Sequence, residues 1–180
     1  MNTVKRRSFL KTSVSAAAVS ALPSISLNAQ EATAPAATVI VVHGTDIPKM
    51  LAAGIAKLGG WDAFIKPGMK VVIKPNVAWN SKPEQGGNTH PDLVKACVLA
   101  AEAQGATKIS LPENPCHPEK ATFQASGIAD ALKGTQARLY RPAKGDYQAI
   151  EIPKGKVAKT ANVPKDILEC DCLINMPVAK

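Results

Sequence analysis

Three short stretches place polar side chains directly after an apolar run: "VVIKPN" at residues 71–76, "LPENPCH" at 111–117 and "LINMPVAK" at 173–180. In the first, a lysine ammonium (Lys74) at the end of the run can bind a carboxylate or a phosphate. Pro75 fixes the turn, and the Asn76 amide offers both a donor and an acceptor. The alternative is that Lys74 is an exposed strand end and that Asn76 binds its own turn backbone.

The second stretch gathers four different reactive or polar groups on one loop: Glu113, Asn114, Cys116 and His117. The adjacent thiol and imidazole, joined by His90 or Asp92 from a neighbouring loop, could bind zinc or iron. The same pair could instead give a thiolate activated by the imidazole. A structural or disulfide-bonded cysteine remains the alternative.

The other cysteines and one tryptophan each allow two interpretations. Cys170 and Cys172 are two apart, so on a strand both sulfurs would face one ion, unless one is simply buried and the other lies near the strand end. Cys97 falls on the apolar side of a predicted helix and is expected in the core. Trp79 could cover a ligand or anchor its loop. In an oxidising compartment the four cysteines of the chain could form disulfides in three pairings.

Short apolar strands alternate with helices along the rest of the chain. Strands are predicted at 38–42, 69–74, 107–111, 137–141, 147–152 and 171–176, and helices at 46–58, 91–104 and 119–133, the last with a break near Gly127. This alternation predicts an α/β fold with a mostly parallel sheet and helices on both faces, as in Rossmann-like proteins. Ligands bind beyond the carboxyl ends of such strands. We therefore expect Lys74, Glu113 and Lys180 at one edge of the sheet, close to the long loop 75–90 that carries Thr89.

The first 29 residues read as an export signal. A basic start with the pair Arg6-Arg7 precedes a weakly apolar run, which is typical of twin-arginine signals and is too short and too rich in serine for a stable membrane span. We expect the twin-arginine export machinery as a partner, a periplasmic or exported location, a disordered tether at 30–37 and a domain at 38–180. Without the signal the net charge falls from +8 to about +4, because four lysines and arginines and no acids are removed, so nucleic-acid binding has little support.

Several segments together resemble the DUF362 family, in members that carry a twin-arginine signal: "VVIKPNVAWN", "EQGGNTHPDLVKACVLAAEAQGATKI", "ENPC", "ASGI" and "CDCLINMPVAK". The family pattern continues beyond "INMPVAK", so the resemblance implies a chain cut off after Lys180. Some relatives are described as iron-sulfur proteins, which implies metal or redox chemistry, although this sequence lacks a ferredoxin cysteine run.

The resemblance leads to two main functional hypotheses. The first is a metal- or cofactor-dependent enzyme, with Lys74, Glu113 and Cys116 as catalytic residues and a metal ion or an iron-sulfur cluster as cofactor. Ligand binding would involve Asn76, Thr89, Asn114 and Lys180, with Cys116, His117 and His90 as metal ligands. The second is a non-catalytic module that binds an anionic small molecule through Lys74 and Lys180. A third reading is an incomplete fragment without a complete site.

Overall fold

The computed structural model describes residues 38–179. Its helices are α1 (Ile47–Lys57), α2 (Pro91–Ala103), α3 (Glu119–Ala125), α4 (Ile128–Ala131) and α5 (Lys165–Leu168), with 3-10 turns η1 (Trp61–Ala63), η2 (Pro83–Gln85) and η3 (Lys144–Asp146). Its strands are β1 (Lys70–Pro75), β2 (Lys108–Pro112), β3 (Arg138–Tyr140), β4 (Tyr147–Glu151), β5 (Thr160–Pro164) and β6 (Cys172–Met176). No helix among these is long and apolar enough to cross a membrane.

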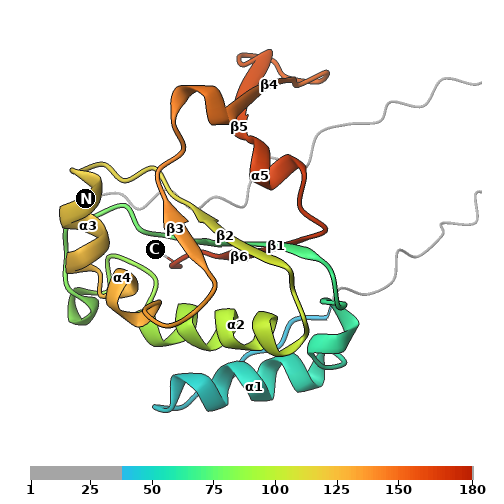
Figure 1. Ribbon diagram of the computed structural model, residues 1–180, viewed down its shortest axis with the longest axis vertical. Coiled ribbons are helices and arrows are strands. Elements are labelled where there is room, and N and C mark those ends of the chain that lie inside the picture. The colour runs from blue at the N-terminus through green and yellow to red at the C-terminus, as the bar shows by residue number, and fades with distance from the viewer. Residues whose placement is uncertain (1–37, 180) are drawn as a thin grey trace, which may run out of the picture. The chain divides into compact units, whose positions relative to one another are not determined.

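Four of the strands form one parallel sheet in the order β3-β2-β1-β6 (Figure 1). In the register, Val71 of β1 lies opposite Ile109 of β2 on one side and Cys172 of β6 on the other. The chain moves outward from β1 to β2 and β3, and returns to the other side of β1 with β6. The predicted α/β fold with a mostly parallel sheet is therefore confirmed. Strands β4 and β5 form a separate antiparallel pair, and β5 was not predicted.

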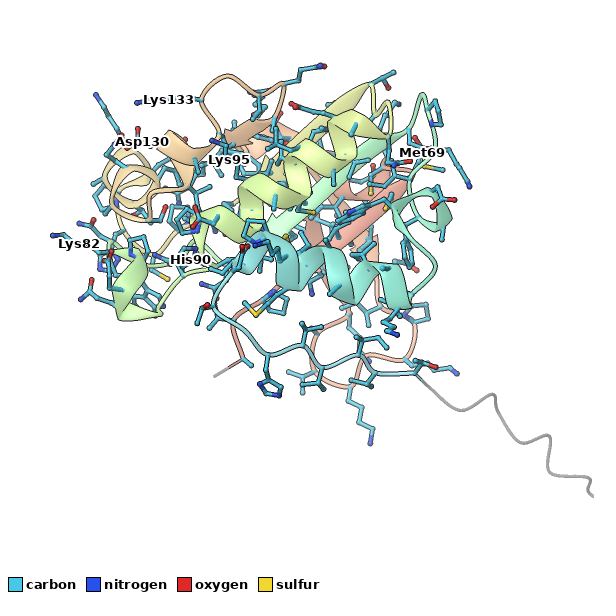
Figure 2. The ribbon with its side chains drawn as sticks, turned by 90° about the horizontal axis from the view of Figure 1, so that it is seen from below. Met69, Lys82, His90, Lys95, Asp130 and Lys133 are labelled. Carbon is cyan, nitrogen blue, oxygen red and sulfur yellow. The ribbon has the colours of Figure 1, made fainter. Side chains whose placement is uncertain are left out.

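Helices α1 and α2 lie side by side across one face of the sheet, as Figure 2 shows from below. The core consists mainly of the buried apolar stripe of α2 against the inward side chains of β1 and β2: Val94, Cys97, Val98, Ala101, Val71, Ile73, Ile109 and Leu111. Continuous burial on both faces explains why β1 reads as an uninterrupted apolar run. On the opposite face, Asp166 of α5 binds Lys108 Nζ at 2.7 Å and accepts a hydrogen bond from Tyr140 Oη at 2.9 Å.

The helix starts follow ordinary capping chemistry. The Asp46 carboxylate accepts a hydrogen bond from the Lys49 backbone N–H at 3.1 Å, so Asp46 is the N-cap of α1. His90 is the N-cap of α2, with Pro91 as the first helical residue. The predicted break at Gly127 is confirmed, because Gly127 separates α3 from α4 with a φ of +73°, a value that favours glycine.

The predicted strand at 38–42 is wrong. These residues form no strand, and Val39 and Val41 are 80% and 72% exposed. β-branched residues favour extended backbone, but a strand also needs a neighbour for its hydrogen bonds, and no described strand pairs with this segment. The predicted signal at 1–29 and tether at 30–37 lie outside the described residues.

Candidate functional site

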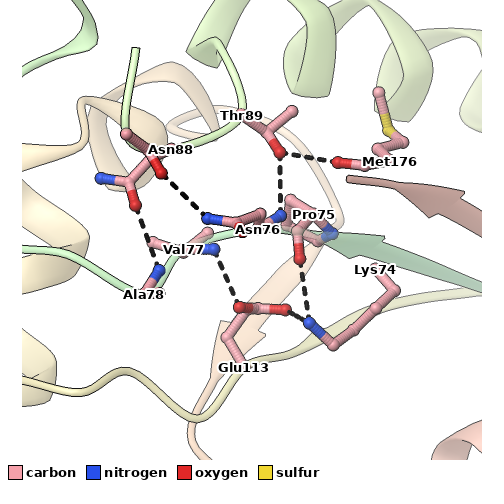
Figure 3. Close-up of polar contacts among 10 residues, drawn as sticks. Lys74, Pro75, Asn76, Val77, Ala78, Asn88, Thr89, Glu113 and Met176 are labelled. Atoms are coloured by element: carbon pink, nitrogen blue, oxygen red, sulfur yellow. Dashed lines mark hydrogen bonds and ion pairs between the residues drawn. The ribbon is translucent and has the colours of Figure 1, made fainter. Parts of the chain in front are cut away.

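The two charged residues predicted at strand ends meet at one edge of the sheet. Lys74 is the last residue but one of β1, and Glu113 directly follows β2. The Lys74 ammonium forms an ion pair with Glu113 Oε1 and donates a hydrogen bond to the Pro75 carbonyl at 2.9 Å (Figure 3). The register of β1 and β2 thus brings together two side chains that are 39 positions apart in the sequence.

The two ends of this ion pair differ in exposure. Glu113 is only 4% exposed, and its second oxygen accepts a hydrogen bond from the Val77 backbone N–H at 2.9 Å. Burial raises the pKa of the Glu113 carboxyl, while Lys74 and the Val77 N–H act in the opposite direction. The Lys74 side chain is 36% exposed. The lysine of the pair is therefore partly exposed, whereas the carboxylate lies inside.

Asn76 and Thr89 connect β1, the following loop and β6. The Thr89 hydroxyl accepts a hydrogen bond from the Asn76 backbone N–H at 2.8 Å and donates one to the Met176 carbonyl at 2.7 Å. The Thr89 N–H donates to the Asn76 carbonyl at 2.9 Å, and the Asn76 side-chain amide donates to the Gly87 carbonyl at 3.1 Å. These groups hold the loop at the point where the strand order reverses, which is where ligands bind in such sheets.

Asn88 organises the same loop, and the sequence reasoning missed it. Its side-chain oxygen accepts hydrogen bonds from the backbone N–H groups of Ala78 and Trp79, both at 3.1 Å. Its amide nitrogen donates to the Trp79 carbonyl at 2.8 Å and to the Ser81 hydroxyl at 3.1 Å. Asn88 is 6% exposed. An asparagine after Gly86-Gly87 in a long loop was the available signal, because asparagine side chains readily bind nearby backbone.

The predicted metal ligands Cys116, His117 and His90 do not form a cluster with further ligands. The His117 ring packs against Trp79, with ring centroids 5.8 Å apart, and its Nδ1 accepts from the Asn80 N–H at 3.4 Å. His90 instead caps α2, where its Nδ1 accepts from the Asp92 N–H at 3.2 Å. Within residues 38–179, no group of three or more His, Cys, Asp and Glu side chains is placed to hold a metal ion.

All four cysteines are free thiols, and they differ in environment. Cys116 is exposed, and its backbone N–H donates to the Ala78 carbonyl at 2.9 Å, which ties its loop to the end of β1. Cys97 is buried, as predicted, and burial raises the pKa of its thiol to about 12. Cys170 precedes β6 and donates to the Ile167 carbonyl at 3.2 Å, whereas Cys172 lies in β6. Burial raises the pKa of both of these thiols.

A polar recess of about 510 Å³ opens near the same edge, and five of its residues were not predicted. It is lined by Asn114, Arg141, Pro142, Lys144, Tyr147 and Asn162. Of these, only Asn114 was predicted as a ligand-binding residue. Lys180, the third predicted strand-end residue, lies outside the described residues.

Comparisons with known proteins give a family and one distant relative. The chain is 26% identical over 129 residues to the thylakoid-associated protein sll1697 of Synechocystis, a match that covers 68% of this chain and 37% of that protein. No solved structure matches the chain. Residues 71–180 match the family described as a domain of unknown function, DUF362, and this match includes Lys74, Asn76, Thr89, Glu113 and Cys116. The chain therefore belongs to the DUF362 family.

Proposed function

We propose that this DUF362 domain binds a small anionic molecule at the carboxyl-end edge of its parallel sheet, with Lys74 as the cation that faces the ligand. The observation that carries the proposal is the asymmetry of the Lys74–Glu113 pair, because the lysine side chain is 36% exposed and its carboxylate partner is buried. A buried carboxylate fixes the position of the lysine, whose ammonium carries three N–H donors, one more than its two internal partners use. The hydrogen-bonded loop around Asn76 and Thr89 gives this edge a fixed shape.

Variants in which charged side chains are replaced by neutral glutamine test the role of Lys74. In Glu113→Gln the lysine loses its competing internal anion, so we expect tighter binding of an external anion. The double variant Lys74→Gln/Glu113→Gln removes both charges, so we expect it to abolish anion binding. Phenyl phosphate and citrate serve as probe anions. Their binding is measured from changes in the backbone amide NMR shifts at the strand ends. The control is Lys70→Gln, which removes a lysine at the opposite end of the same strand. Equal binding by the double variant and the wild type would refute the role of Lys74.

A second candidate function is a metal- or cofactor-dependent enzyme, such as a redox enzyme. Its support is the exposed Cys116 thiol next to His117, on the loop that follows β2 at the same edge. A thiolate and an imidazole suit zinc or iron, but a complete site needs at least one more ligand. In such an enzyme the Lys74–Glu113 ion pair would lie at the same edge of the sheet as the thiol and the imidazole.

Metal analysis distinguishes this candidate from simple anion binding. The second candidate requires stoichiometric zinc, iron or nickel in the purified full chain, lost in Cys116→Ala and retained in Cys170→Ala, whereas simple anion binding requires none. A metal content that is unchanged in Cys116→Ala would remove this residue from any metal site.

The export prediction also becomes a proposal. The Arg6-Arg7 pair supports transport by the twin-arginine machinery into the periplasm. The curated relative is named as thylakoid-associated. Cell fractionation of the Arg6→Lys/Arg7→Lys variant checks the proposal, with retention of the uncleaved chain in the cytoplasm as the expected result. Unchanged export would refute it.

A further inference from the structure

The polar recess is built where four segments meet. Asn114 follows β2, Arg141 follows β3, and Lys144 begins the η3 turn that leads into β4. Tyr147 is the first residue of β4, and Asn162 lies in the middle of β5. Figure 1 shows that the chain, after the end of β3, leads away from the main sheet to the β4–β5 pair. The recess thus joins the end of the parallel sheet to the small antiparallel sheet.

Neighbouring contacts hold the backbone of this recess in place. Pro142 is buried, and the Ala143 N–H donates to the Asp146 carboxylate at 2.8 Å. The Lys165 ammonium donates to the Gly145 carbonyl at 2.9 Å, which connects the η3 turn to the start of α5. The Glu119 carboxylate accepts a hydrogen bond from the Arg141 backbone N–H at 3.3 Å. Glu119 and Asp146 thus each bind a backbone N–H group beside the recess through one carboxylate oxygen.

The lining of the recess carries two cationic side chains and no acidic residue. Within residues 38–179, the side chains of Arg141 and Lys144 make no ion pair and no hydrogen bond. Lys74 and Lys108, by contrast, each pair with a carboxylate. Two unpaired cations that share one recess attract an anion with two negative charges more strongly than one with a single charge.

We propose that this recess binds the dianionic group of a small molecule, a phosphate monoester or a dicarboxylate, with the apolar part of the ligand against Tyr147. The Arg141 guanidinium can bind two oxygens at once, and Lys144 adds a point charge. Asn114 and Asn162 supply amide donors, and the half-buried Tyr147 ring supplies an apolar surface. A volume of about 510 Å³ is typical of small-molecule sites.

This inference deepens the proposed function and rests on it, because Asn114 directly follows Glu113 and joins the recess to the Lys74 edge. It adds the class of ligand and the residues that select it. Lys74 faces the edge as a single, internally paired cation, whereas Arg141 and Lys144 offer two unpaired charges. Selection for a dianion over a monoanion is therefore assigned to the recess.

Isothermal titration of the full chain tests the proposal, with phenyl phosphate, phthalate and the neutral benzyl alcohol as probes. We expect phenyl phosphate or phthalate to bind, their comparison to show which dianion is preferred, and benzyl alcohol not to bind. Arg141→Gln should raise the Kd about tenfold or more, which corresponds to the loss of a charge-assisted hydrogen bond. Arg141→Lys should recover only part of the affinity, because it keeps the charge and loses the two-pronged geometry.

Two control variants complete the experiment. Lys144→Gln should weaken dianion binding, whereas Lys154→Gln, with the same charge change on the β4–β5 connection outside the recess, should leave the Kd within about twofold. The proposal is overturned if neither dianion binds, if Arg141→Gln leaves the Kd unchanged, or if Lys154→Gln weakens binding as much as Lys144→Gln does.

The variant Lys74→Gln/Glu113→Gln separates this inference from the proposed function. Binding that is lost in Arg141→Gln but kept in the double variant supports the recess and refutes the role of Lys74. Binding that is lost in the double variant but kept in Arg141→Gln refutes the recess and leaves the proposed function standing.

Discussion

The Thr89 hydroxyl gives the sharpest test of how the candidate site is held together. Thr89→Val keeps the shape of the side chain and removes the group that bonds to the Asn76 N–H at 2.8 Å and to the Met176 carbonyl at 2.7 Å. Thr89 is 4% exposed and Met176 is 8% exposed, so water has little access to the groups that lose their partner.

The expected loss follows from those two groups. Each buried polar group that is left without a partner costs roughly 1–3 kcal/mol, so the two groups together should lower the free energy of unfolding of Thr89→Val by about 2–6 kcal/mol. This is a large part of the roughly 5–15 kcal/mol that keeps a typical domain folded. Urea unfolding followed by circular dichroism measures it, provided that the slope with urea concentration is unchanged.

Two matched variants isolate the hydroxyl. Thr89→Ser keeps the hydrogen bonds and should lose only about 1 kcal/mol, from one buried methyl group. Thr107→Val removes a hydroxyl that donates to the Gly68 carbonyl at 2.8 Å on an exposed surface, so water can replace it and the loss should stay below about 1 kcal/mol. If Thr89→Val cost no more than Thr107→Val, the connection between β1 and β6 through Thr89 would not contribute to stability as argued.

Three further predictions concern the loop, the thiols and the pH dependence of stability. Asn88→Ala should raise the hydrogen-exchange rates of the Ala78 and Trp79 amides well above those of α2, because it removes their shared acceptor, and unchanged rates would contradict this role. Iodoacetamide at pH 8 should label the exposed Cys116 and leave Cys97 unlabelled until urea unfolds the chain, since burial raises the pKa of Cys97 to about 12; peptide mass spectrometry reads this directly. Burial tends to raise the pKa of Asp166, but its contacts with the Lys108 ammonium and the Tyr140 hydroxyl work against burial, and the net pKa is lowered. The stabilising contribution of Asp166 therefore exists above the unfolded-state pKa and disappears as the pH falls through the folded-state pKa. Asp166→Asn should therefore destabilise the chain at pH 7 and approach the wild type in acid, and a difference that does not depend on pH would refute the assignment.

Local sequence patterns were sufficient for much of the main sheet. The run Val71-Val72-Ile73 predicts a buried strand because β-branched side chains pack well on a pleated surface. Gly127 and the Asp46 cap mark helix boundaries because their preferences depend only on nearby backbone. The meeting of Lys74 and Glu113 also followed from sequence, since the carboxyl ends of parallel strands share one edge.

Only the tertiary structure decided the remaining features. The segment 38–42 has the composition of a strand, yet strand formation depends on a partner, which local composition cannot supply. The ring of His90, a predicted metal ligand, caps α2, because the helix start places it beside the Asp92 N–H. The recess with Arg141, Lys144 and Tyr147 depends on how the β4–β5 pair is placed next to the ends of β2 and β3. The sequence by itself thus determined which polar residues end the strands, whereas long-range packing decided which of them meet and which cations remain unpaired.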